Sequence, residues 1–154
     1  MRTEHPPESE LRTALAAFET ALTTPVVSGE LADWVESLQE TWQEASSQLH
    51  GSIQDAHPRQ YEQIADADPS LLPRIEQLKA EDTELAQQRE HVNQLLARAA
   101  QHVPKLEPDE AKAQKHMENL INEGLALVVR ARKQEVSIET WFLEAFNRDR
   151  GAVD

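Results

Sequence analysis

Residues 75–92, "IEQLKAEDTELAQQREHV", contain the pattern that decides the fold. The apolar residues of this stretch recur at steps of three, seven and seven, the spacing expected of a buried stripe on a long helix in a bundle. The same stripe includes Asp82 and Arg89. A charge at a helix-packing position is costly unless it is paired, hydrogen-bonded or bound to a ligand. The stretch therefore predicts a long helix whose buried face holds polar side chains that need partners.

Three further stretches show the same helical spacing of apolar residues, and prolines, which disfavour helix interiors, fall mostly between them. Ser28 is expected to cap the second helix, and residues around Gly51 and Pro58 are expected to form a bent continuation of it, or a short separate helix, ending by Asp68. The β-branched run "LALVV" lies inside a helical period, which favours helix over strand. The expected helices are 8–24, 28–53, 69–103 and 107–147. The predicted fold class is all-α, an antiparallel up-down-up-down four-helix bundle.

The size of the chain indicates one domain. With 154 residues and 39% hydrophobic content, the sequence has enough apolar material for a single core. We expect a flexible tail over 1–7, one bundle domain over 8–148 and a second tail over 149–154. The absence of a long apolar run argues against a signal peptide or a membrane span, so a cytoplasmic protein is expected.

Charge and composition disfavour several function classes. The formal net charge is −13 with only 15 Lys and Arg, which opposes binding to nucleic acid or to anionic membranes. There is no cysteine, so any metal must use His, Asp or Glu as ligands. No glycine-rich phosphate loop or nucleophile elbow is present, and we do not expect an enzyme. An unknown protein partner is expected, with the chain as a monomer or small homo-oligomer.

Several polar side chains fall on or beside the predicted apolar stripes. One interpretation is an internal salt-bridge network, in which Asp82 and Arg89, two turns apart, interact with Glu135 or Gln134. The predicted buried polar network consists of Gln54, Asp82, Arg89, Gln134 and Glu135. The other interpretation is a metal site, because helical bundles hold metals with His and carboxylate side chains from facing helices.

Two segments resemble bacterial hemerythrin-like (HHE cation-binding) proteins. They are "LHGSIQDAHPRQYEQIADADPSLLPRIEQLKAEDTEL", residues 49–85, and "EVSIETWFLEAFNRDRG", residues 135–151. The resemblance implies a hemerythrin-like four-helix bundle that holds a di-iron centre for oxygen or related small molecules. In that family, the second helix carries a His-x-x-x-Glu pair, the third a Glu-His step and the fourth a further His and acid.

Compared with that ligand pattern, the sequence keeps few of the family's ligands. His50 matches the histidine of the first pair, but Gln54 stands in place of the carboxylate. Asp82 follows Glu81 where a histidine would be expected. On the fourth helix, Gln134 appears in place of the histidine, Glu139 retains the acid, and the first helix offers no histidine. An amide is a poor iron ligand and cannot neutralise the metal's charge, so a degenerate or absent di-iron site is expected.

Three hypotheses about function follow. The preferred one is a hemerythrin-like bundle without a working metal centre, which acts as a scaffold or protein-interaction domain and needs no cofactor. The second is a working, oxygen-responsive iron protein that uses a rearranged ligand set, namely His50, His57, Glu81, Asp82 and Glu139. The third is an acidic helical interaction module without metal ancestry.

Overall fold

The computed structural model describes the backbone of residues 7–27, 29–102 and 110–153 and the side chains of residues 10–27, 29–101 and 114–147. Within these ranges all regular structure is helical, so the predicted all-α class is confirmed. The long helices are α1 (Pro7–Thr23), α2 (Leu31–Gly51), α3 (His57–Ala67), α4 (Leu72–His102) and α5 (Glu110–Val153). A π-helical turn, η1 (Ser52–Ala56), joins α2 to α3, and a 3-10 turn, η2 (Pro69–Leu71), leads into α4.

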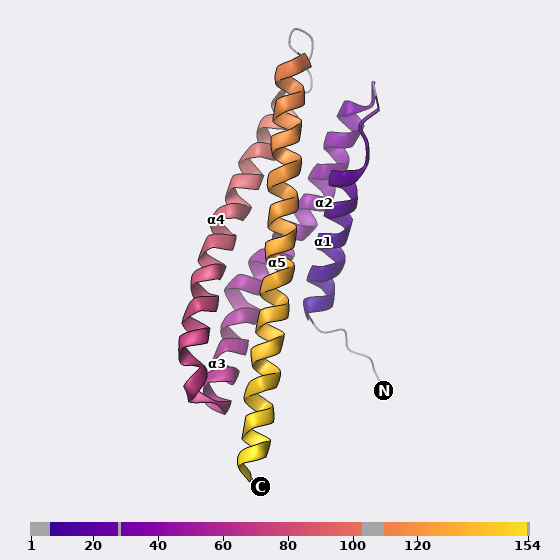
Figure 1. The fold of residues 1–154 in the computed structure, drawn as a ribbon. Coiled ribbons are helices and arrows are strands. Elements are labelled where there is room, and N and C mark those ends of the chain that lie inside the picture. Colours follow the sequence, from indigo (N-terminus) through magenta and orange to yellow (C-terminus); the bar gives the residue numbers. More distant parts are fainter. Residues whose placement is uncertain (1–6, 28, 103–109, 154) are drawn as a thin grey trace, which may run out of the picture.

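The helices lie lengthwise beside one another (Figure 1). The segments α2, η1 and α3 follow one another without a break and form one long bent rod. The shorter α1 packs against α2 and α5, and α2 and α5 both contact α4. At the other end of the molecule, α3 contacts α5 and α4, beyond the start of α1 (Figure 1). The helix α5 therefore runs along both halves of the structure.

Most helix limits agree with the sequence within a few residues. The first helix spans 7–23 against the expected 8–24, and the "LALVV" run is helical, as predicted. The largest difference is at the last helix, whose backbone continues to Val153 past the expected end at 147 and through most of the expected tail from 149. Ser28, the tail residues 1–6 and the expected helix start at 107 lie outside the described residues.

The π-helical turn explains how the second rod accommodates Pro58. Proline has no N–H, and its ring clashes with the carbonyl group four residues earlier in an α-helix. In η1 the backbone N–H of His57 instead donates to the carbonyl of Ser52, five residues back. The extra residue in this turn changes the phase between α2 and α3. As a result, side chains before and after residues 52–56 point in directions that a continuous α-helix would not give them.

The core consists of two apolar clusters, one above the other along the helices. The larger cluster joins α1, α2, α4 and α5, and it contains Phe18, Leu38, Leu85 and Val128, among others. The smaller cluster joins α3, η2, α4 and α5 and includes Ile64, among others. In the described part of the chain, no helix is both long enough and apolar enough to cross a bilayer.

Candidate functional site: a buried ionic network

A layer of polar residues separates the two apolar clusters. On α4, Asp82 lies between Leu78 of the smaller cluster and Leu85 of the larger one. On α5, Gln134 and Glu135 lie between residues of the two clusters in the same way. Together with side chains from the start of α3, these three residues form a polar layer across three helices.

His57 is at the centre of this layer. Its Nδ1 lies 3.0 Å from Oδ1 and 3.1 Å from Oδ2 of Asp82, and its Nε2 lies 2.5 Å from Oε2 of Glu135. The imidazole is only 1% exposed, and the two carboxylate residues are 6% and 4% exposed. Both ring nitrogens therefore face a carboxylate, which favours a doubly protonated, cationic His57.

Asp82 has two further hydrogen-bond donors. The hydroxyl of Tyr61 donates to its Oδ2 at 2.6 Å, and Nε2 of Gln134 donates to its Oδ1 at 3.0 Å. Gln134 also donates to the carbonyl oxygen of Leu78 at 2.9 Å. The carboxylate of Asp82 is thus held by donors from α3 and α5, which answers the question raised by its place on the apolar stripe.

The pKa of His57 follows from these contacts. Burial alone would lower the pKa, because it disfavours the charged form. The hydrogen bonds to Asp82 and Glu135 and the charges of both carboxylates outweigh burial and raise the pKa of His57 to about 9. Burial and the contact with Asp82 also raise the pKa of Tyr61 above its ordinary value. At neutral pH the layer therefore holds one cation between two carboxylates, beside a neutral phenol.

The arrangement of the two carboxylates around His57 differs from that of metal ligands. Metal ligands must converge on one point, whereas here the imidazole ring lies between the carboxylates and fills the space where their ligand atoms would meet. In the ranges with described side chains, no group of three or more His, Asp or Glu is arranged to hold a metal ion. The layer can hold a proton on His57, and its contacts can fix the positions of α3, α4 and α5 relative to one another along their axes.

The structure brings together only two of the five residues proposed as metal ligands. His57 and Asp82 are buried and in contact, but His50 and Glu81 are exposed on the surface. Glu139 is exposed as well, and it lies 3.7 Å from Arg12 of α1. The π-helical turn explains why His50 and His57 are separated. It changes the phase of α3 relative to α2, so the two side chains point in different directions.

The predicted polar network is corrected at two residues. Asp82, Gln134 and Glu135 do lie in one buried layer, but Gln54 is exposed and outside it. Arg89 does not pair with Asp82; its Nε donates to Ser46 on α2 instead. The reason is geometric: Arg89 is seven residues from Asp82, about 10 Å along the helix axis, and at its height the neighbouring helix is α2.

Sequence reasoning did not assign His57 as the cation of the network, nor Tyr61 as a member of it. The spacing of four and three residues through His57, Tyr61 and Ile64 contained the signal, because it places the histidine on the same face as a buried isoleucine. A histidine continuing an apolar stripe next to internal carboxylates on other helices would have indicated the ion pair.

Comparison with known proteins gives no match: no family model, no curated protein and no solved structure is similar to this chain. The hemerythrin-like resemblance therefore stays a prediction from the sequence.

Proposed function

We propose that the chain is a non-catalytic scaffold of the hemerythrin-like, antiparallel four-helix type, located in the cytoplasm, that acts through contacts with a second copy of itself. The observation that supports this most directly is an apolar stripe on the outer surface of α5. The buried ionic layer supports the scaffold role in a second way, because its charged groups pair with one another inside the molecule. The specific partners of each buried charge stabilise one register of the helices, a use of buried polar groups that is well attested in coiled coils.

The outer stripe of α5 consists of Val129, Val136 and Leu143. These side chains are 63%, 55% and 57% exposed, and they are seven residues apart, so they lie along one side of the helix. Apolar residues that are exposed singly are ordinary, but a stripe at heptad spacing is typical of a helix that pairs with another helix.

The stripe is suited to pairing with itself. In an antiparallel pair with Val136 at its centre, Val129 of one copy lies opposite Leu143 of the other. Arg132 and Glu139 lie on one border of the stripe, at nearly equal distances before and after Val136. In the antiparallel pair, Arg132 of one copy therefore comes close to Glu139 of the other, and the reverse pair forms as well. Both already face α1, through Glu19 at 2.8 Å and Arg12 at 3.7 Å.

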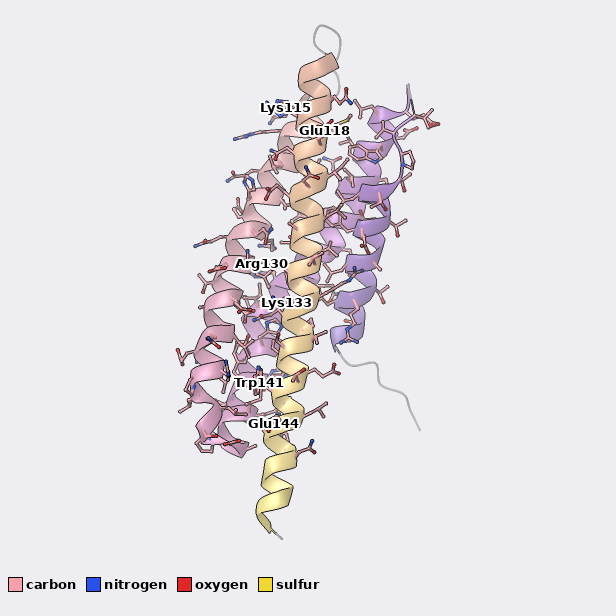
Figure 2. The ribbon with its side chains drawn as sticks, viewed as in Figure 1. Lys115, Glu118, Arg130, Lys133, Trp141 and Glu144 are labelled. Carbon is pink, nitrogen blue, oxygen red and sulfur yellow. The ribbon has the colours of Figure 1, made fainter. Side chains whose placement is uncertain are left out.

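The wider charge distribution along α5 agrees with this orientation. Arg130 and Lys133 precede Val136, and Glu144 follows it (Figure 2). An antiparallel arrangement brings the segment with Arg130 and Lys133 of one helix toward the segment with Glu139 and Glu144 of the other, whereas a parallel one would place like charges together. A second copy therefore fits the stripe both in shape and in charge.

The test is the mass of the protein in solution by size-exclusion chromatography with light scattering. We expect the wild type to be a dimer and Val136→Lys to be a monomer, because the substitution places two ammonium groups against each other at the centre of the pair. Val27→Lys is the matched control, since Val27 is 56% exposed but lies outside α5; it should remain a dimer. A monomeric wild type at its highest soluble concentration, or a dimeric Val136→Lys that is folded by circular dichroism, would overturn the proposal.

A further inference from the structure

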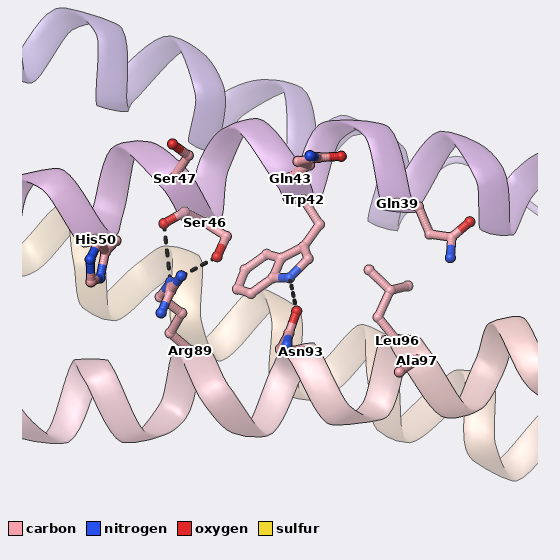
Figure 3. A pocket seen from close by; sticks show the side chains of 10 residues that line it. All are labelled: Gln39, Trp42, Gln43, Ser46, Ser47, His50, Arg89, Asn93, Leu96 and Ala97. Atoms are coloured by element: carbon pink, nitrogen blue, oxygen red, sulfur yellow. Dashed lines mark hydrogen bonds between the residues drawn. The ribbon is translucent and has the colours of Figure 1, made fainter.

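A groove between α2 and α4 is separate from both the buried ionic layer and the outer stripe of α5. It is open to solvent and has a volume of about 520 Å³. Trp42, Ser46 and His50 line it from α2, and Arg89, Asn93 and Leu96 line it from α4 (Figure 3). The groove therefore combines a cation and neutral polar groups with an indole ring and a leucine.

Arg89 is held in the groove by a hydroxyl and a carbonyl group. Its Nε donates to Ser46 Oγ at 2.7 Å and to the carbonyl oxygen of Ser46 at 3.1 Å (Figure 3). Among the residues whose side chains are described, no carboxylate pairs with it, in contrast to Arg12, Arg59, Arg130 and Arg132. The two terminal nitrogens of Arg89, Nη1 and Nη2, are left to donate to a ligand.

The lining of the groove contains no acidic residue. This is notable because the chain has 28 Asp and Glu against 15 Lys and Arg. The other polar groups around Arg89 are amides, hydroxyls and one imidazole. Trp42 Nε1 donates to Oδ1 of Asn93 at 3.1 Å, which leaves the Nδ2 donors of Asn93 for other partners. The groove is thus a local donor-rich region on an otherwise acidic protein.

We propose that this groove binds a small organic monocarboxylate. The carboxylate accepts two parallel hydrogen bonds from Nη1 and Nη2 of Arg89, the bidentate geometry that a guanidinium offers to a planar anion. The apolar part of the ligand lies against Trp42 and Leu96. A single negative charge balances the single arginine, whereas a phosphate dianion would carry excess charge into a protein with a net charge of −13.

The test uses sodium benzoate as the probe, titrated into the full chain while ¹H–¹⁵N spectra are recorded. The indole N–H of Trp42 and the side-chain amide of Asn93 should shift saturably, with a Kd on the order of 1–10 mM for a ligand of this size. Benzamide has nearly the same shape as benzoate but no charge. Its affinity should be at least about tenfold lower than that of benzoate. Inorganic phosphate should also bind more weakly than benzoate.

The role of Arg89 is tested by Arg89→Gln, with Arg130→Gln as the matched control. Arg130 is an exposed arginine that pairs with Glu84 and Gln88, away from the groove. We expect benzoate binding to be lost in Arg89→Gln and unchanged in Arg130→Gln, with both variants folded by circular dichroism. Absence of saturable shifts in the wild type, equal binding by Arg89→Gln, or phosphate binding as tight as that of benzoate would overturn the assignment.

Discussion

At the scale of single residues, the buried layer depends on one cation. His57 is in contact with both Asp82 and Glu135, and in the described part of the chain no lysine or arginine reaches either carboxylate. Asp82 keeps neutral donors from Tyr61 and Gln134, but these supply no compensating charge. Loss of the charge on His57, by pH or by substitution, should therefore destabilise the fold.

The first prediction concerns pH. The pKa of His57 is raised in the folded protein from 6.5 to about 9, so folding is linked to binding of a proton. The resulting stabilisation is fully present below pH 6.5 and is lost as the pH rises through 9; it amounts to about 3 kcal/mol. Urea unfolding measured across this range should show the fall. In His57→Gln, which cannot titrate at this position, the fall should be largely absent, and an equal fall in both proteins would assign it to other groups.

The second prediction compares two cationic residues. His57→Ala leaves two carboxylates buried without a counterion, so it should lower the free energy of unfolding by about 3–5 kcal/mol. Arg89→Ala should cost only about 1 kcal/mol, because Arg89 is half-buried and its partners are neutral groups of Ser46. Thermal and urea unfolding measure both. If Arg89→Ala were as damaging as His57→Ala, Arg89 would have to interact with the buried carboxylates after all.

At the scale of helices, the approach of α1 to α5 depends on a glycine. A Cβ atom at Gly124 would lie 2.8 Å from Cδ1 and 3.1 Å from Cδ2 of Leu22, and 3.4 Å from Cε2 of Phe18. Both neighbours are fully buried, with 1% and 0% exposure, so they have little space in which to move. The close packing of these two helices therefore requires a small residue at position 124.

The third prediction compares two helical glycines, Gly51 and Gly124. Gly51→Ala meets nothing within 4 Å, so it should stabilise the protein by about 0.5–1 kcal/mol through helix propensity. Gly124→Ala gains the same propensity but overpacks Leu22, which costs about 1–3 kcal/mol, so its net effect should be a loss of about 1 kcal/mol. Urea unfolding of the two variants measures the difference. Equal stabilisation by both would show that Leu22 and Phe18 adjust without cost.

At the scale of the whole molecule, the question is whether the helices hold iron. Of the five residues of the rearranged ligand set, only His57 and Asp82 are in contact, and the other three are exposed. The fourth prediction is that protein purified without an affinity tag is colourless, contains no stoichiometric iron by elemental analysis, and gains no thermal stability from ferrous iron. A ligand that binds only the folded state must raise stability. Stoichiometric iron that is lost in His50→Ala would instead favour a working metal protein.

The sequence by itself determined the helices and which side of each is buried. Helical spacing of apolar residues is a local property, and the burial of Asp82, Gln134 and Glu135 could be read from their place on the stripes. Prolines placed several of the helix limits for the same reason, but no proline marks the end of α5, which continues past the expected residue 147. Even the choice of helix over strand for residues 125–129 needed only the surrounding period.

Only the tertiary structure decided which buried charges meet. His57 reaches Asp82 and Glu135 because a π-helical turn sets its direction, and because α3, α4 and α5 are in one particular register. Arg89 faces Ser46 rather than Asp82 because of the helix that lies beside it at that height. A hydrogen bond acts over about 3 Å, which is shorter than one helical turn. The sequence pattern shows which side of its helix a residue occupies, but it does not show which residue of another helix lies within that distance.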